Sequence, residues 1–410
     1  MSAHPLSPAV AQQALDAHAR NGGKLTEAAE ELGIPRPTLE GRLRAAKRYK
    51  LTPGAGLSAP NDPAALKSRI KQLEGQLRAQ ASEEALTNEI RTKIVGLAKS
   101  IGEADPPDWI TDDRKSDDSP GVPTLFLSDF HWGEVVKAPQ IMHKNRYNLA
   151  IARERLKTVV NTASQLLKII SPKMDYPGIV VLLGGDMISG NIHEELQTTN
   201  EINTMPTVLD LYGELVSTIT HLADTFGQVF LTCVTGNHGR DTQKIWHKDR
   251  HHTSFDWLLY CFLAKHFEKD RRVQFQIPDG PDAYFRIYNH RYLLTHGDQF
   301  RGGDGMIGAL GPIIRGDHKK RSRNAQIDME YDTMAIGHWH QDIFLRRLIV
   351  NSSLKGYDEY AFNNNFPFEV PSQQLWLTHQ KHRITYRMPV YAERETSRDA
   401  PKTEWVRFAA

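Results

Sequence analysis

The sequence predicts an α/β protein in which a layered domain follows a small helical head. From about residue 122, short apolar runs alternate with amphipathic helices, which is the pattern of packed strand and helix layers. The first fifty residues have the pattern of short helices, the last of them basic. We expect a helical head (1–52), a helical or coiled segment (62–100), an acidic linker (101–121), the layered domain (122–392) and a tail (393–410).

Composition sets limits on the classes of function. The chain has 410 residues and a net charge of +2, so any nucleic-acid contact must depend on local basic patches. The two cysteines, Cys233 and Cys261, lie in apolar runs, and we interpret them as core thiols in a reducing compartment. The first residues lack a leader pattern and no apolar stretch approaches membrane-spanning length, so we expect a cytoplasmic protein with no membrane contact.

The head begins with an expected helix over residues 8–20, which Gly22 or Gly23 can close. Thr26 is expected to cap a second helix that runs through Leu32. A third helix should then start around Pro37, because proline suits the first turn of a helix.

The third helix carries a strong basic bias. Leu39 and Leu43 should face inward, while residues 36–50 contain six basic residues against one acid, Glu40. This region resembles the helix-turn-helix of the Fis type, whose second helix enters the major groove of DNA. The alternative is a three-helix protein-interaction module with a solvated basic face. The resemblance implies DNA contacts from Arg36, Thr38, Arg42, Arg44, Lys47 and Arg48.

Two segments connect the head to the layered domain. In residues 62–100, apolar residues repeat at coiled-coil spacing, but a nine-residue gap between Leu77 and Leu86 breaks the heptad frame. Two short coiled segments or a helical hairpin fit this pattern, and either could pair subunits into a homodimer or a higher oligomer. Residues 101–121 hold seven acids, two bases and several prolines, which we expect to exclude regular structure.

Five apolar runs of the layered domain end in residue types that bind metals. Parallel strands of open α/β sheets place their sites beyond their carboxyl ends, so these residues should meet. Apolar residues at helical spacing predict a helix over 147–170 and another over 205–225, between the first three runs. In an extended segment, residues i and i+2 face the same side. The pattern predicts a metal site from Asp129, His131, Asp186, Asn237, His238, His296, His338 and His340.

These motifs carry a family resemblance over residues 122–390. Asp129-x-His131, Gly185-Asp186-x-x-x-Gly190, Gly236-Asn237-His238, His296-Gly297 and Gly337-His338-x-His340 resemble the calcineurin-like metallophosphoesterases. That superfamily includes nuclease subunits of double-strand-break repair complexes and cyclic-nucleotide phosphodiesterases. The surrounding sequence is also similar to bacteriophage proteins. The resemblance implies a four-layer α-β-β-α sandwich, in which two mixed sheets pack face to face with helices outside.

The resemblance also implies roles for the site residues. Asp129, His131, Asp186 and His340 would hold one divalent ion, and Asp186, Asn237, His296 and His338 would hold the second. The mixed nitrogen and oxygen donors favour Mn²⁺, with iron or Zn²⁺ as alternatives, over Mg²⁺. A hydroxide that bridges the two ions would be the nucleophile, and His238 would protonate the leaving oxygen as general acid.

One departure from the family pattern follows His238. Many members have an acidic residue directly after this histidine, whereas here Gly239 and Arg240 precede Asp241. We expect Asp241 to orient His238 from this more distant position, and Arg240 to be available for a substrate phosphate.

The substrate is expected to be DNA, with other possibilities open. Arg301, Arg315, Lys319 and Lys320 lie between the His296 and His338 motifs, where they could follow a polynucleotide backbone or belong to a solvated loop. Trp246 could stack on a base or pack in the core. The alternatives to a DNA nuclease are a phosphatase or phosphodiesterase of small esters and a non-catalytic DNA-binding regulator. The need for an ATPase partner stays open.

Two further strands after Asn351 should complete the second sheet.

Overall fold

The computed structural model describes residues 7–53, 106–111, 120–302 and 308–393. The chain divides into two compact units, Met1–Ile90 and Arg91–Ala410, which are described separately below. The pairing segment expected at 62–100 and the tail after residue 393 lie outside the described residues. Across the described part of the chain, no helix combines the length and the apolar character needed to cross a membrane.

The first unit contains three helices around a small apolar core. They are α1 (Pro8–Arg20), α2 (Leu25–Glu31) and α3 (Arg36–Arg48). Leu39 of α3 is fully buried against Ala14, Ala28 and Ala29. The predicted helix over 8–20 is confirmed, but the predicted cap at Thr26 is wrong, because α2 already begins at Leu25.

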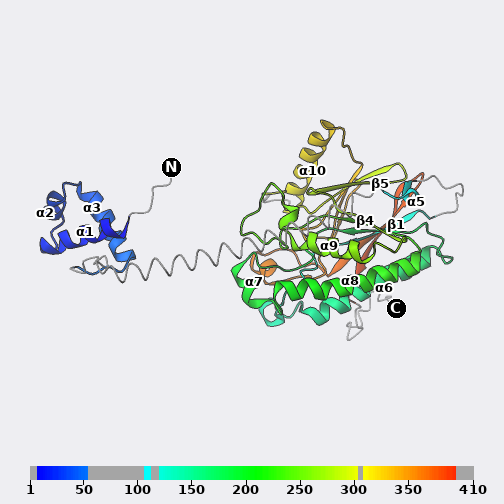
Figure 1. The fold of residues 1–410 in the computed structure, drawn as a ribbon, viewed down its shortest axis with the longest axis horizontal. Coiled ribbons are helices and arrows are strands. Elements are labelled where there is room, and N and C mark those ends of the chain that lie inside the picture. The colour runs from blue at the N-terminus through cyan, green and yellow to red at the C-terminus, as the bar shows by residue number, and fades with distance from the viewer. Residues whose placement is uncertain (1–6, 54–105, 112–119, 303–307, 394–410) are drawn as a thin grey trace, which may run out of the picture. The chain divides into compact units, whose positions relative to one another are not determined.

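The second unit is built around two β-sheets (Figure 1). The first sheet has six strands in the order β11-β10-β1-β2-β3-β4, and the second has five in the order β5-β6-β7-β9-β8. The first sheet comprises β1 (Val122–Leu127), β2 (Ile179–Leu183), β3 (Val229–Cys233), β4 (Val273–Gln276), β10 (Ser372–His379) and β11 (Arg383–Tyr391). The second comprises β5 (Asp282–Ile287), β6 (His290–Thr295), β7 (Thr333–Ile336), β8 (Ile343–Phe344) and β9 (Leu348–Val350).

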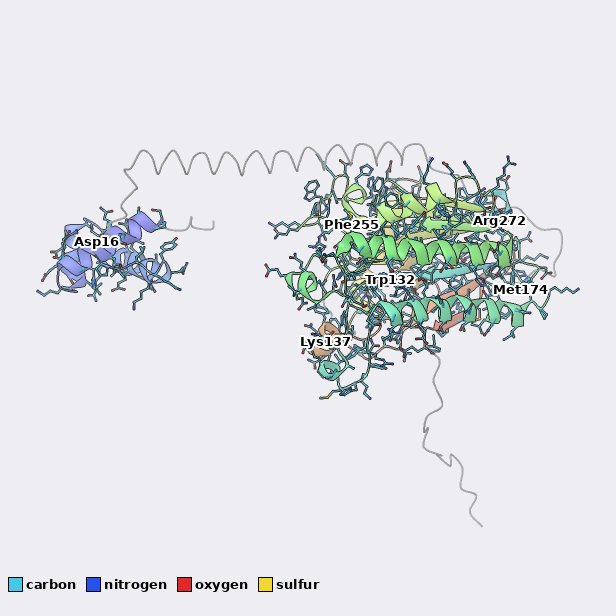
Figure 2. All side chains as sticks on the ribbon, turned by 60° about the horizontal axis from the view of Figure 1, so that its bottom comes forward. Asp16, Trp132, Lys137, Met174, Phe255 and Arg272 are labelled. Atoms are coloured by element: carbon cyan, nitrogen blue, oxygen red, sulfur yellow. The ribbon has the colours of Figure 1, made fainter. Side chains whose placement is uncertain are left out.

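Helices cover the outer face of each sheet, which completes four layers. Three long helices lie on the first sheet and one on the second, and α6 and α8 run side by side (Figures 1 and 2). They are α6 (Leu149–Ile170), α8 (Thr204–Phe226), α9 (Phe255–His266) and α10 (Leu310–Ala325). Short turns of helix occupy the connections: α5 (Asp108–Thr111), η1 (Ala138–Ile141), α7 (Glu194–Thr199), η2 (His251–Thr253) and α11 (Glu359–Asn363).

Strand β1 is apolar on both faces because each face is covered by a core. Leu125 and Leu127 point into the core beneath the helices, while Phe126 between them points into the core shared by the two sheets. Successive side chains of a strand alternate between faces, so a strand covered on both sides must be continuously apolar. The expected α-β-β-α sandwich is therefore confirmed.

Part of the expected linker belongs to the second unit. Ile110 of α5 is fully buried between the sheets, and its carbonyl accepts a hydrogen bond from Tyr288 N at 2.7 Å. The expectation that prolines exclude regular structure throughout 101–121 is wrong here, because Pro106 and Pro107 precede this turn, where a missing N–H is tolerated.

The last two strands lie in the first sheet, so the expectation that they complete the second sheet is wrong. β10 pairs antiparallel with β1, with Leu125 opposite Leu375, and β11 pairs antiparallel with β10. After the second sheet, the chain thus returns to the first sheet and adds two strands beside β1. Trp376 of β10 lies in the core between the sheets.

Candidate metal centre

The loops that follow β1 and β2 run side by side at one end of the first sheet. Asp129 N donates to Gly185 O at 3.0 Å, and His131 N donates to Asp186 O at 3.1 Å. Trp132 is fully buried, and its indole N–H donates to the Asp210 carboxylate of α8 at 2.7 Å. These bonds hold Asp129 and His131 next to Asp186.

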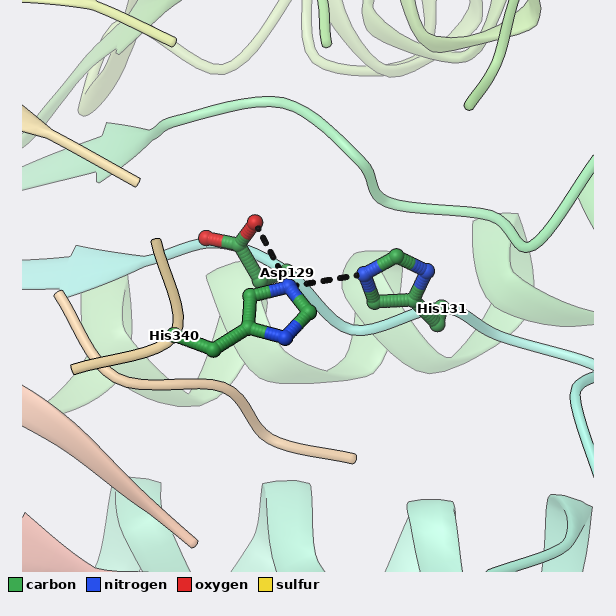
Figure 3. Close-up of side chains that lie close together, drawn as sticks. All are labelled: Asp129, His131 and His340. Atoms are coloured by element: carbon green, nitrogen blue, oxygen red, sulfur yellow. Dashed lines mark hydrogen bonds and ion pairs between the residues drawn. The ribbon is translucent and has the colours of Figure 1, made fainter. Parts of the chain in front are cut away.

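The first cluster combines Asp129, His131 and His340 (Figure 3). His340 Nε2 lies 3.1 Å from His131 Nε2 and 3.4 Å from Asp129 Oδ1. Two facing imidazole nitrogens cannot both donate a proton to each other. A spacing of this size suits nitrogens that share one cation, since each lies about 2.0–2.1 Å from a bound Zn²⁺.

The second cluster combines Asp186, His296 and His338, with Asn237 beside it. His296 Nε2 lies 3.0 Å from Asp186 Oδ2 and 3.2 Å from Asn237 Oδ1. Its other ring nitrogen lies 2.8 Å from the carbonyl oxygen of Gly184, which fixes the ring orientation. The loops after β6 and β7 bring His296 and His338 together, as Gly337 N donates to His296 O at 2.9 Å.

Asp186 stands between the clusters. Its carboxylate also accepts a hydrogen bond from His238 N at 2.7 Å, and His131, Asp186 and His238 form a third group with ligand atoms close together. The structure thus brings together all seven sequence-predicted ligands and His238. Their roles as ligands stay a prediction.

A backbone carbonyl contacts the ring of His238. His238 Nδ1 lies 3.0 Å from the carbonyl oxygen of Ser189. Asp241, by contrast, is exposed, and its backbone N–H donates to Thr253 O. The contact at the Nδ1 atom of His238 is thus with the Ser189 carbonyl, and orientation of His238 by Asp241 stays a prediction.

Backbone conformation is unusual at the candidate ligands. Five of the seven have left-handed φ: Asp129 (54°), His131 (47°), Asp186 (51°), His338 (66°) and His340 (52°). The two histidines after β7 are therefore not in an extended segment, as their i, i+2 spacing had suggested. Non-glycine residues in this region carry strain that the surrounding fold must sustain, and such residues cluster at functional sites.

Glycines allow the carboxylates to sit directly against the backbone. A Cβ atom at Gly236 would lie 2.0 Å from Asp186 Oδ1, and one at Gly337 would lie 2.3 Å from Asp129 Oδ2. Any side chain at these two positions would displace a candidate ligand.

Burial makes most of these histidines neutral in the metal-free protein. It lowers the pKa of His131 well below the usual range and the pKa values of His238 and His338 to about 4. At His296 burial acts in the same direction, but the charge and hydrogen bond of Asp186 outweigh it and raise the pKa to about 10. The same pairing lowers the pKa of Asp186.

The donor set fits divalent transition-metal ions. Neutral imidazole nitrogens are good ligands, and here they are combined with two carboxylates and an amide oxygen. Four candidate ligands, Asp129, His131, Asp186 and His296, are at most 1% exposed. The other three, Asn237, His338 and His340, are partly exposed to solvent. An ion held by these residues would therefore be accessible to a ligand from one side.

The expected phosphate-binding basic residues are only partly available. Arg315, Lys319 and Lys320, for which a solvated loop was the alternative, lie in α10. Lys320 is buried with its Nζ 2.6 Å from Asp282 Oδ1, so its expected contact with substrate is wrong. Arg240 donates to the carbonyls of Asn237, Thr242 and Gln243. Arg301, Arg315 and Lys319 are exposed, and they stay candidates for phosphate contacts.

Sequence reasoning missed residues that hold the centre together. The carboxylate of Asp256 on α9 is fully buried and accepts hydrogen bonds from the backbone N–H groups of Asp186, Met187 and Gly236 at 3.0, 3.2 and 2.9 Å. Behind the first cluster, buried Lys355 binds Glu134 and Asp358, and Glu134 Oε2 lies 3.5 Å from His131 Nδ1. A lone acid in an apolar helix gives no sequence signal for the role of Asp256, and a buried ion pair between loops that are far apart in the sequence gives none for Lys355 and Glu134.

We expect Asp256→Ala to destabilise the protein and impair the centre together. The change leaves three buried N–H groups without their acceptor, each at a cost of about 1–3 kcal/mol. Urea denaturation should show a lower free energy of unfolding, with a smaller loss for Asp256→Asn, which keeps one acceptor oxygen. Equal stability of Asp256→Ala and wild type would contradict this role.

The metal-free protein should lose stability as the pH falls from about 6.5 to about 4. Over this range the unfolded chain protonates His238 and His338, whose ordinary pKa is about 6.5, while the folded chain keeps them neutral because their pKa values are about 4. Denaturation in chelator should show this fall, at about 1.4 kcal/mol per pKa unit for each group. His238→Gln should have a shallower slope, and an unchanged slope would refute neutral burial of His238.

Comparisons with known proteins add little to these observations. No family model and no curated protein matches the sequence. Similar solved structures include a conserved uncharacterized protein of Streptococcus pneumoniae TIGR4, a predicted phosphoesterase, with 9% identity over 66% of this chain and 99% of that one, at a TM-score of 0.25. Another is the sulfate thiohydrolase SoxB of Thermus thermophilus in complex with glycerol, with 10% identity over 68% of this chain and 58% of that one, at a TM-score of 0.28. At these TM-scores we base the function of this chain on its own side chains.

Proposed function

We propose that this protein is a two-metal phosphodiester hydrolase and that its substrate is DNA. The observation that carries the proposal is the position of Asp186, whose carboxylate belongs to two groups of close ligand atoms at once, one with His131 and His238 and one with His296 and His338. A carboxylate shared in this way can hold two ions about 3.5–4 Å apart, the separation that suits in-line displacement at phosphorus.

We assign the first ion to Asp129, His131, Asp186 and His340, and the second to Asp186, Asn237, His296 and His338. When bound, the ions would lower the pKa of water and neutralise charge on the phosphoryl oxygens. Manganese is our first choice of metal, with iron and Zn²⁺ as alternatives, because the donors mix nitrogen with oxygen.

We assign to His238 the transfer of a proton to the leaving oxygen. Its Nδ1–H can donate to Ser189 O at 3.0 Å, which holds the ring and favours the protonated form, although burial lowers its pKa to about 4. The negative charge of a bound phosphodiester next to the ring would oppose this lowering of the pKa of His238. His238 can then protonate the departing oxygen.

Two features favour DNA over small esters. On α3, Arg44 and Arg48 are exposed while Leu39 is buried, so the helix presents a basic face. Beside Asn237, a small pocket is lined by Trp246 and Arg250, and Trp246 is 51% exposed rather than part of the core. An exposed indole next to a basic side chain suits a stacked base.

Two other functions remain candidates. A phosphatase or phosphodiesterase of small esters would use the same centre, with the head serving only to place the enzyme. A non-catalytic regulator is the weaker candidate, because the donor set at the centre is complete. Pairing of subunits through 62–100 and orientation of His238 by Asp241 stay predictions.

A cleavage assay tests the proposal. Purified protein with Mn²⁺ is offered single-stranded DNA, duplex DNA and bis-p-nitrophenyl phosphate, with Asp186→Ala and His238→Ala as controls. Cleavage of DNA that is lost in Asp186→Ala would support the nuclease. Turnover of the small ester with DNA left intact would instead identify a small-ester phosphodiesterase.

We expect Arg44→Ala/Arg48→Ala to weaken DNA binding by at least about tenfold at low salt and to lower the salt dependence by roughly two counterions. The physical reason is the loss of two phosphate contacts from the exposed face of α3. Fluorescence anisotropy at several salt concentrations measures both quantities. Arg20→Ala is the matched control, since Arg20 of α1 already pairs with Glu31 at 2.5 Å. Equal effects of the two changes would contradict DNA recognition by α3.

A further inference from the structure

A second group of metal-binding residue types lies outside the candidate centre. It combines His251 and His252 of η2 with Asp279, from the loop between β4 and β5. One ligand atom from each of the three lies within 4.8 Å of the others. The two rings have centroids 3.9 Å apart, and His251 Nε2 lies 3.5 Å from Asp279 Oδ1. None of these residues belongs to the sequence motifs of the candidate centre.

A buried nitrogen points to a ligand at this group. His251 is 6% exposed, and its Nε2 has no hydrogen-bond partner among the residues that the structure describes. Buried polar atoms are nearly always satisfied, so an atom of this kind calls for an explanation. An ion coordinated by Nε2 would supply the missing partner.

The surroundings fix the two rings and leave one side open. Trp257 of α9 contacts both histidines edge-on, with centroid distances of 6.3 Å to His251 and 4.9 Å to His252. The backbone of η2 is held by hydrogen bonds from His252 N to Asp249 O and from Ser254 N to His251 O, both 3.0 Å. The side chain of Asp279 is 82% exposed, so an ion and its water ligands can enter from solvent.

We propose that His251, His252 and Asp279 bind a single transition-metal ion, with Zn²⁺ the best match. Two imidazoles and one carboxylate supply three ligands of the kinds that Zn²⁺ takes, and water completes a tetrahedron. Ca²⁺ and Mg²⁺ prefer all-oxygen shells and are disfavoured by two nitrogens.

The ion would join η2 to the β4–β5 loop and brace the segment that supports the candidate centre. Arg250, directly before η2, donates to the Asp298 carboxylate at 2.8 Å. Asp256, just after η2, accepts the three backbone hydrogen bonds at the candidate centre. The role of the proposed ion is thus structural, and the proposal does not depend on the reaction assigned to the candidate centre.

Zinc content of the full-length chain tests the proposal. Wild type, His251→Ala/His252→Ala and Asp279→Asn are stripped with chelator, reloaded with Zn²⁺, separated from free metal and measured by mass spectrometry. Circular dichroism in chelator checks the fold of each. The matched control is His247→Ala, an exposed histidine in the same segment but outside the group.

We expect the double variant to hold one zinc ion fewer per chain than wild type and His247→Ala. Competition with a chromophoric chelator should show at least tenfold weaker binding of that ion in Asp279→Asn. The same ion should persist in Asp186→Ala/His296→Ala, which alters the candidate centre alone. Equal zinc content in wild type and the double variant overturns the proposal. Because Asp279 is exposed, its replacement leaves the fold intact, and unchanged affinity in Asp279→Asn overturns the proposal too.

Discussion

Asp186→Asn should reduce turnover of every phosphodiester substrate by about 1,000-fold or more. The amide has the shape of the carboxylate but not its charge, and Asp186 contributes to both ligand groups. In the proposed two-metal centre, loss of the bridging anion would weaken the binding of both ions, whose stabilisation of charge in the transition state would be worth several kcal/mol. Steady-state kinetics with Mn²⁺ and metal content per chain measure the two effects.

The matched control is Asp224→Asn, which makes the same chemical change at an exposed residue of α8 that pairs with Arg272 at 2.8 Å. It should stay within about twofold of wild type, because surface ion pairs contribute little. If Asp186→Asn retained both ions and activity within tenfold of wild type, the two-metal assignment would be wrong.

His238→Ala should lower kcat on DNA by about 100- to 10,000-fold and leave the metal content unchanged. A positioned general acid contributes a rate factor of this size, and a deoxyribose oxygen is a poor leaving group that needs a proton. The loss should be far smaller on bis-p-nitrophenyl phosphate, because p-nitrophenolate departs without protonation. The ratio of the two losses measures the contribution of the proton.

His193→Ala is the control for His238→Ala, since this exposed imidazole has its ring centroid 5.8 Å from that of His238 but belongs to neither ligand group around Asp186. It should change kcat on DNA only a few-fold. If His238→Ala instead released an ion, His238 would be a ligand, as its closeness to His131 and Asp186 allows. Equal losses on DNA and on the small ester would also count against proton transfer.

The sequence was most informative where chemistry restricts the residue type at a strand end. Few side chains bind metals, and the glycines beside them mark sharp turns, so all of the candidate ligands could be located before the structure was known. The layered α/β class was predictable for a similar reason, because β1 and β2 are apolar on both faces.

Contacts that depend on the backbone or on distant segments could not be predicted. A carbonyl such as that of Ser189 exists at every residue, so nothing in the sequence marks it as the partner of His238. The role of Asp256 depends on how α9 meets two loops, and the pairing of β10 with β1 joins segments about 250 residues apart. The predicted phosphate contact of Lys320 was wrong because a run of charged residues does not reveal that one of them pairs with a buried acid.

The first ligand cluster has a consequence for how the protein is made. His131 and His340 face each other across 209 residues of sequence, so the cluster is complete only after most of the chain has left the ribosome. Until then, the emerging chain contains Asp129 and His131 of this cluster but not His340. Binding of an ion by all three residues would therefore require synthesis beyond His340, and a fragment that ends before β7 would lack one member of the first cluster.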